Sequence, residues 1–419
     1  MHSQIPTEPL LSTTYAQRVA FVSEIAGRLH TYGTTAQRLE TAVTALAKQL
    51  GLDCEPWSNP TGIILSFSDP RRAIGSSDIT RVIRLEPGEN DLHKLCVADY
   101  VAENVSSGRM SIAQGHTALR RLDRPLRFYE EVHTILASGL AVAGIAGLWK
   151  LSWLDIITAS VIGLLIGVLS RYINRYSAAK EASEALTALI AATVACCVGT
   201  YIGPLNLNSV IIASLVVLLP GMSLTNAVNE LTSQHWVSGT ARFAGALMVV
   251  IKMAVGSYIA VTVAHKLGMH PQSHSLATTP EWVEGGALCM SAYAFAVLFK
   301  AHRYDYPLVM ASAIFGYLIS RFTGQLWGSI AGTFISAMVI TLSGNLYGRL
   351  VQRPGALIRL PGIILLVPGS MSLRGLLEWV QLNNADVSND AFGIVLSVVM
   401  ALVSGLLFGN LLVPARKPL

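Results

Sequence analysis

A Pro-Gly pair inside an apolar run would place several backbone amides where they could bind a carboxylate. Pro220 lacks an N–H and clashes with the preceding helical turn, and Gly221 tolerates the bend that results. The pair therefore predicts a break between two half-helices. The second half-helix would begin with the amides of Gly221, Met222 and Ser223, and free N–H groups at a helix N-terminus attract carboxylates.

Three polar side chains after the break could bind the other polar groups of a ligand that carries a carboxylate. Glu230 could accept a hydrogen bond from an ammonium group, and Asn226 and Asn229 could bond to a hydroxyl. The same residues fit a second interpretation, in which the helix is only kinked and its polar residues lie in a cytoplasmic loop. The sequence leaves both interpretations open.

The pattern recurs 148 positions later, where Pro368-Gly369 ends another short apolar run and Ser370 follows. Glu378 stands ten residues after this proline, as a glutamate does in the first copy. Interrupted apolar segments at corresponding places in two halves of a chain point to a transporter binding site. Arg374 and Glu378 lie four residues apart, so they could also pair with each other on one helix face. In that case Glu378 is structural, and only the glutamate of the first copy is free.

A lysine lies within another apolar segment. Lys252 is surrounded in the sequence by valine, isoleucine and methionine, and a charge in such a place usually faces a cavity or a partner. It could pair with Glu230, balance the carboxylate of a substrate, or release its proton during a transport cycle. Alternatively, its long side chain extends to the membrane surface.

These residues belong to a chain that is apolar over most of its length. Apolar residues make up 52% of the 419 residues and charged residues 13%, whereas soluble proteins carry about 25% charged residues. Residues 1–128 have the composition of a soluble domain, and membrane-like sequence follows from about residue 132 to 412. The ten expected membrane spans lie near 133–149, 153–170, 184–201, 207–227, 240–263, 284–300, 305–320, 325–346, 357–379 and 391–413.

The distribution of arginine and lysine indicates the orientation of these spans. With a cytoplasmic N-terminus, about fifteen of these residues fall inside and four outside, namely Lys150, Lys266, Arg321 and Arg374. This is the bias that the positive-inside rule describes. Both termini are then expected to be cytoplasmic, in a chain that crosses the membrane several times.

The two Pro-Gly pairs divide the spans into two modules, residues 129–268 and 269–419, with five spans each. An odd number of spans inverts the second module relative to the first, which places a binding site at their interface. The predicted fold is therefore a mostly α membrane protein with about ten helices in two inverted five-helix repeats with broken helices. A small cytoplasmic α+β domain, residues 1–128, precedes them.

This N-terminal domain has readable elements. Helical periodicity covers Tyr15–Tyr32 and Ala36–Leu50, with Gly33 between them. Short β-branched or alternating runs predict strands at 53–57, 62–67 and 80–85, and two more helices are expected near 91–106 and 111–122. Arg38 and Glu40 could line a small-molecule pocket or contact the membrane part, or they could lie on a solvated helix face.

Several motifs together resemble the bacterial threonine/serine exporter family, in the form in which a hydrophilic N-terminal domain and two membrane modules are fused. The resemblance covers residues 20–413 and implies export of L-threonine and L-serine across the inner membrane, driven by an ion gradient, with H⁺ as the expected coupling ion. The segments that carry it are Gly33–Glu40, Asn59–Ile63, Leu219–Gly221, Asn229–Leu231, Ser238–Arg242, Pro361–Ile363 and Leu366–Ser370.

Other functions find less support in the residues. There is no P-loop and no GxGxxG after a strand, so we expect no nucleotide cofactor. Five cysteines show no CxxC spacing, and three histidines before Glu281 lack other ligands, so we expect no metal. The net charge of +5 does not call for nucleic acid, because arginines cluster at the membrane ends.

Two alternatives to amino-acid export remain. The chain could export another small carboxylated metabolite, or it could be a membrane-anchored enzyme whose N-terminal domain performs hydrolysis. We expect no enzyme, because neither a Ser-His-Asp arrangement nor a paired-carboxylate signature stands out. The expected partners are an amino-acid substrate, a coupling ion and membrane lipid, and the sequence leaves a homo-oligomer open.

Overall fold

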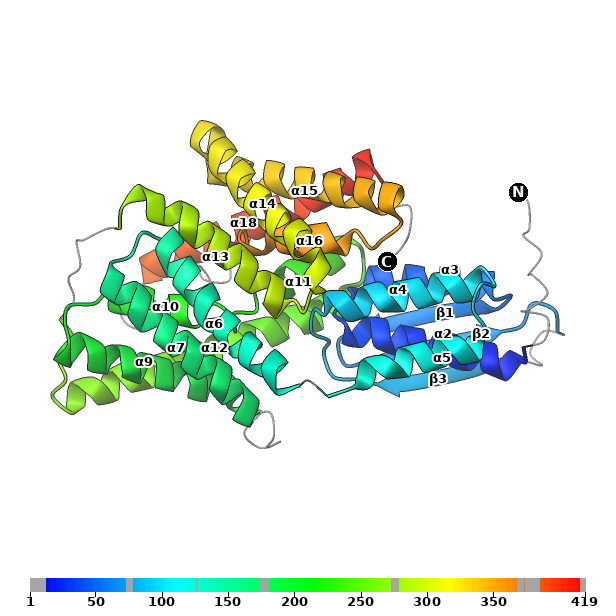
Figure 1. The fold of residues 1–419 in the computed structure, drawn as a ribbon, viewed down its shortest axis with the longest axis horizontal. Helices are drawn as coiled ribbons and strands as arrows, with labels where there is room; N and C mark the ends of the chain where they lie inside the picture. Colours follow the sequence, from blue (N-terminus) through cyan, green and yellow to red (C-terminus); the bar gives the residue numbers. More distant parts are fainter. Residues whose placement is uncertain are drawn as a thin grey trace.

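The structure is a computed structural model, and it describes residues 13–72, 78–125, 127–173, 181–272, 279–367, 373 and 385–414. An N-terminal unit with a small sheet lies at one end of a larger array of helices (Figure 1). Five of the predicted site residues lie outside the described residues: Pro368, Gly369, Ser370, Arg374 and Glu378.

The N-terminal unit has the helices and strands that the sequence predicts, with bounds that agree within a few residues. Its elements are α2 (Tyr15–Thr31), α3 (Ala36–Gln49), β1 (Asp53–Asn59), β2 (Gly62–Ser68), β3 (Ile79–Arg84), α4 (Leu92–Ser106), α5 (Ile112–Arg120) and the 3₁₀ turn η1 (Arg121–Asp123). Gly33 lies in the turn between α2 and α3. Its φ is +82°, a left-handed conformation that glycine adopts without steric cost. This turn fixes where α3 begins.

The sheet is antiparallel with strand order β1-β2-β3. Ile63, Leu65 and Phe67 alternate along β2 and are buried, so one face of the sheet packs against helices. Helix α3 packs on β1 and α2 on β2. The buried residues of this unit continue into Phe295 and Leu357 of the membrane helices, which makes one hydrophobic cluster across the junction.

A buried histidine in this unit predicts a pH-dependent stability. Burial lowers the pKa of His30, which is 4% exposed and has Nε2 3.2 Å from the carbonyl oxygen of Pro60. As the pH falls, the unfolded chain therefore takes up the proton first, near pH 6.5. The stabilisation is complete above about pH 6.5 and is lost as the pH falls through the folded pKa, by at most about 1.4 kcal/mol per pH unit.

We expect the melting temperature of the full-length protein to fall between about pH 7 and about pH 5 less steeply in His30→Gln than in the parent chain. Glutamine can keep the bond to Pro60 but does not titrate. Thermal unfolding across this pH range measures the difference, and superimposable profiles would contradict the assignment.

The rest of the described chain is helical. Its elements are α6 (Phe128–Leu148), α7 (Trp153–Ile173), α9 (Ser183–Tyr201), α10 (Leu207–Ser214), α11 (Gly221–Thr232), α12 (Trp236–Lys266), α13 (Glu281–Leu298), the 3₁₀ turn η2 (Arg303–Asp305), α14 (Tyr306–Trp327), α15 (Ser329–Val351), α16 (Ala356–Ile364) and α18 (Ala385–Leu412).

Six of these helices are long and apolar enough to cross a membrane: α6, α7, α9, α12, α15 and residues 393–412 of α18. The expected ten spans are therefore shown only in part. Helices α10, α11 and α16 are each shorter than the ~20 apolar residues that a full span requires. Helices α13 and α14 are long enough, but they carry Glu281, Glu284 and Arg321. The count of ten remains a prediction.

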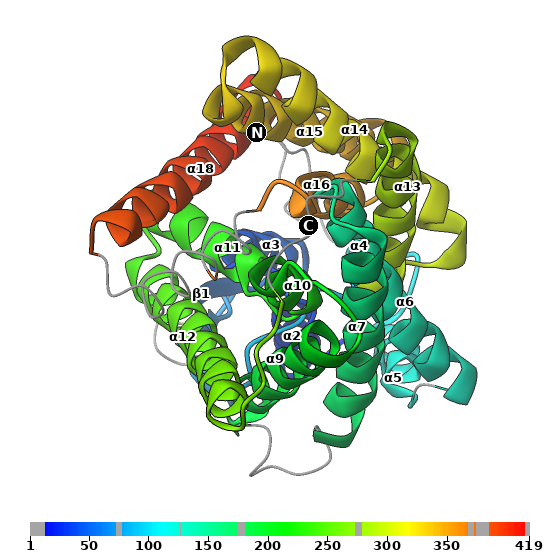
Figure 2. The ribbon, with the colours of Figure 1, turned by 90° about the vertical axis from the view of Figure 1, so that its left-hand side faces the viewer.

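The short helices lie among the long ones. Viewed from the end away from the N-terminal unit, α10, α11 and α16 are surrounded by the longer helices (Figure 2). Glycines permit the close crossing of α14 and α16, since a Cβ on Gly316 would collide with the carbonyl oxygen of Gly362. Ser312 Oγ also donates to the carbonyl oxygen of Ile358 at 2.6 Å. Such small residues allow membrane helices to pack backbone to backbone.

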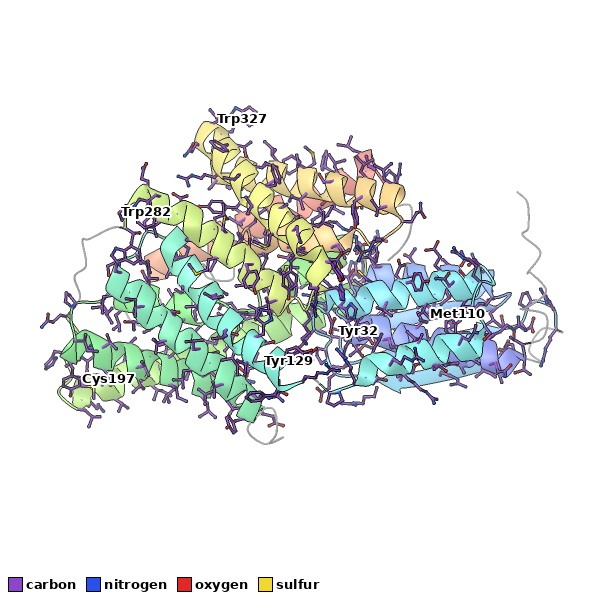
Figure 3. All side chains as sticks on the ribbon, viewed as in Figure 1. Tyr32, Met110, Tyr129, Cys197, Trp282 and Trp327 are labelled. Atoms are coloured by element: carbon purple, nitrogen blue, oxygen red, sulfur yellow. The ribbon has the colours of Figure 1, made fainter. Side chains whose placement is uncertain are left out.

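Exposed aromatic side chains mark the two ends of the helix array. Trp282 and Trp327 are 72% and 69% exposed; Trp282 lies on the side away from the N-terminal unit and Trp327 at the top of the array, whereas Tyr129 lies near that unit (Figure 3). Tryptophan and tyrosine are enriched at both membrane–water interfaces. Their positions agree with a membrane that leaves the N-terminal unit on one side.

Candidate functional site

The chain is interrupted at the first Pro-Gly pair. Helix α10 ends at Ser214, and α11 begins at Gly221 after a series of turns. Pro220 precedes α11 with φ −80° and ψ 39°, and its carbonyl oxygen accepts the first helical bond from Leu224 N at 2.9 Å. Gly221, Met222 and Ser223 therefore form the first turn, whose N–H groups have no partner in a preceding turn of the same helix.

Glu230 lies at the junction between α11 and the N-terminal unit. It is fully buried, and Arg242 of α12 donates to it from both Nε and Nη2 at 3.1 Å. Ser238 Oγ donates at 2.8 Å, and the backbone N–H of Ala36 donates at 3.0 Å. Ala36 is the first residue of α3, so the carboxylate also lies at a helix N-terminus, where a negative charge is stabilised.

A second polar contact joins the same two segments. His235, in the turn between α11 and α12, has Nε2 2.9 Å from Glu40 Oε2. The other carboxylate oxygen of Glu40 accepts from Ser58 N at 2.8 Å. A Cβ on Gly239 would lie 2.9 Å from the carbonyl oxygen of Ala227, so α11 and α12 approach closely here. The sequence motifs around positions 36–40 and 229–242 thus form one interface.

A cavity of about 90 Å³ lies beside this interface. Its lining comes from both parts of the protein. The residues are Tyr32, Gly33, Thr34, Thr35, Gln37, Arg38 and Leu95 from the N-terminal unit, Asn226 and Asn229 from α11, Ala356, Arg359, Leu360 and Ile363 from α16, and Leu406 and Asn410 from α18. Tyr32 marks its place at the junction (Figure 3). Two of the predicted site residues, Asn226 and Asn229, therefore lie in a cavity.

Two arginines in the lining have no carboxylate partner among the described residues. Arg359 is 7% exposed, and its Nε is buried without a hydrogen bond. Arg38 is half-buried, and desolvation lowers the pKa of its guanidinium to about 10, which leaves it charged at neutral pH. The hydroxyls of Thr34 and Thr35 are also buried without a partner. Unpaired buried polar groups of this kind call for a ligand, an ion or water.

Comparison with known families agrees with this architecture. A family model described as "Putative threonine/serine exporter" matches residues 20–264, which is more than half of the chain. The chain belongs to the threonine/serine exporter family. A second model of this family, "Threonine/Serine exporter, ThrE", matches residues 286–412. No match was found among curated proteins or among solved structures.

Membership of the exporter family confirms the resemblance that the motifs predicted. The first match ends within α12 and the second begins within α13, so each covers one set of membrane helices. Together with the six candidate spans, the family indicates a multi-pass protein of the cell membrane that is a transporter rather than an enzyme.

Lys252 in this member of the exporter family contacts two residues that the sequence did not suggest as partners. Its Nζ donates to the backbone carbonyl of Glu181 at 2.7 Å and lies 3.5 Å from Glu184 Oε2 at the start of α9. Glu230 is held by other groups, as described above. The partners of Lys252 could not be read from the sequence, because α9 and α12 come together only through packing. Its role in transport remains a prediction.

A cluster of charged side chains lies near the ends of the membrane helices that are farther from the N-terminal unit. Glu284 of α13 is 7% exposed and accepts from Tyr317 OH at 3.0 Å. It pairs with Arg321 and lies 3.7 Å from Lys150 Nζ. Lys150 and Arg321 are two of the four basic residues expected outside, and here they meet. Sequence reasoning missed Glu284, although an acidic residue in an apolar helix is itself a signal.

Proposed function

We propose that this chain is a secondary-active exporter of threonine and serine across the bacterial inner membrane. The observation that carries the proposal is the interrupted helix at Pro220-Gly221 in a chain of this family. In membrane proteins, non-helical backbone at depth is tolerated where it is covered by protein or lines a cavity, and broken helices often form substrate sites.

The element order supports two inverted repeats. Helices α6, α7, α9, α10 and α12 have counterparts in α13, α14, α15, α16 and α18, in the same order and of broadly similar lengths. Both α10 and α16 are short helices that end shortly before a Pro-Gly pair. Such repeats place the substrate between the two halves. The amides that begin α11 and those expected after Pro368 would then face one substrate.

Transport by the purified protein tests this function. Liposomes that contain the protein and unlabelled L-threonine should accumulate external labelled L-threonine by exchange, and L-serine should compete. An imposed pH gradient should drive net movement if H⁺ is the coupling ion. Protein-free liposomes are the control. Failure of threonine and serine to exchange, with another small carboxylate exchanging instead, would favour the alternative substrate class.

The orientation is tested by cysteine labelling. In a chain without its five natural cysteines, a cysteine at the exposed position 304 should react only from the cytoplasm, because η2 lies on the side of the N-terminal unit. A cysteine at the exposed position 272 should react only from outside. Cytoplasmic labelling at 272 would contradict both the inverted repeat and the cytoplasmic termini.

A further inference from the structure

We propose that the cavity between the N-terminal unit and the membrane helices binds a small molecule through its carboxylate, with Arg38 and Arg359 as the guanidinium donors. The site differs from the helix break, because its cationic groups come from α3 and α16. It goes beyond the proposed transport function, since the ligand could be the exported amino acid or a separate organic acid.

Charge is the first argument. The described residues that line the cavity include two arginines and no aspartate or glutamate. The glutamate of α11, Glu230, already accepts four hydrogen bonds, from Arg242, Ser238 and Ala36. A buried charge without a counter-charge is costly, and guanidinium groups bind carboxylates with two parallel hydrogen bonds. A ligand with a carboxylate would supply the missing charge.

Unused hydrogen-bonding groups are the second argument. Thr34 and Thr35 contribute buried hydroxyls without partners, and Asn226 and Asn229 contribute amides. Asn410 Oδ1 accepts from Asn345 Nδ2 at 2.9 Å, which orients the Asn410 amide. These groups can bind the hydroxyl or second polar group of a ligand. The volume of about 90 Å³ is several times the ~10–15 Å³ needed for one water, so the cavity has room for more than a single water.

Both arginines are held in place by the local fold. The aliphatic part of Arg359 packs against Gly344 of α15, where a Cβ would lie 2.9 Å from Arg359 Cγ. Arg38 lies in the first turn of α3, whose start is set by the turn at Gly33. Gly33 has φ +82°, and a Cβ there would lie 3.1 Å from the backbone N of Asn90, so a larger residue would strain this turn. The two guanidiniums are therefore presented by fixed backbone rather than by exposed loops.

A ligand in this cavity would connect the N-terminal unit with the membrane helices. Arg38 and the two threonines belong to the former, and Arg359 and the asparagines to the latter. Binding would stabilise the docked arrangement, because a ligand stabilises the state that contains its site. The N-terminal unit would then sense a carboxylate at the cytoplasmic entrance of the membrane helices.

Calorimetric titration of the purified full-length protein tests the proposal. The probes are malonate, L-threonine and L-threoninol, which resembles threonine but lacks the carboxylate. We expect malonate to bind and threoninol not to bind. Arg38→Gln and Arg359→Gln should each weaken malonate binding by about tenfold or more, because each removes a charge-assisted contact. Arg349→Gln is the matched control, since Arg349 bonds to the carbonyl oxygen of Pro414 outside the cavity.

The L-threonine titration distinguishes the two sources of the carboxylate. Threonine binding that is lost in the same two variants assigns the site to the exported amino acid, and binding of malonate alone assigns it to another organic acid. Either result supports the carboxylate site. The absence of binding by both probes in the parent protein, or binding unchanged in both arginine variants, overturns it. Threonine flux of the same preparations is measured separately, so failure of the transport function is recognised independently.

Discussion

Arg242→Met is expected to loosen the N-terminal unit from the membrane helices and to reduce threonine flux by about tenfold or more. Methionine keeps an unbranched apolar stem like the aliphatic part of arginine, but it removes the two donors that Arg242 directs at Glu230. The carboxylate of Glu230 is fully buried and would lose its only counter-charge among the described residues. Removing one partner of a buried ion pair costs about 3–5 kcal/mol.

Two measurements detect this effect. Hydrogen exchange of the Ala36 amide, which donates to Glu230 at 3.0 Å, should accelerate when α3 separates from α11. Flux in liposomes should fall in parallel. Arg349→Met is the control, because Arg349 is a half-buried arginine that donates to the carbonyl oxygen of Pro414, with no carboxylate involved.

A double variant separates the loss of charge balance from the loss of the arginine itself. In Glu230→Gln with Arg242→Met, no buried charge remains unpaired, so part of the docking should return relative to Arg242→Met alone. If Arg242→Met and the double variant both show the amide hydrogen exchange and the threonine flux of the parent, Glu230 does not hold the junction. We further expect Glu230→Gln alone to impair transport more than Glu378→Gln, because Glu230 accepts four hydrogen bonds at the junction.

Replacing the first Pro-Gly pair is expected to abolish threonine transport. Pro220→Ala restores an N–H and removes the ring, which favours a continuous helix between α10 and α11. Gly221→Leu adds a side chain to the buried first residue of α11, where a substrate would approach the backbone. Either change should remove the amides that the proposal assigns to the substrate carboxylate.

The measurement is binding of L-threonine to the purified variants together with flux in liposomes. Pro307→Ala is the matched control, because Pro307 lies in the first turn of α14, where the missing N–H is normally tolerated. Equivalent changes at Pro368 and Gly369 should also cost transport, since the proposed site is shared by both halves. If all four variants bind and transport L-threonine like the parent protein, the two Pro-Gly pairs shape the helices but do not form the substrate site.

Much of the fold follows from local sequence. The period of the apolar residues determines α2 and α3, the turn signals between alternating runs determine β1 to β3, and Pro220 determines where α11 begins. These features depend mainly on residues a few positions apart, whose preferences act before distant parts of the chain meet. The family motifs and the apolar segments are likewise properties of the chain itself.

The partners of the polar residues were decided only by the tertiary structure. Glu230 accepts from an amide 194 positions earlier in the chain, and Lys252 bonds to the carbonyl of Glu181, 71 positions away. Arg38 and Arg359 line the same cavity because α3 and α16 meet at the junction. No spacing rule predicts such contacts, because burial and pairing depend on which helix faces approach each other. The sequence therefore determined most of the elements and several candidate residues, whereas packing decided the partners of those residues and added Arg359 and Glu284, which local patterns did not single out.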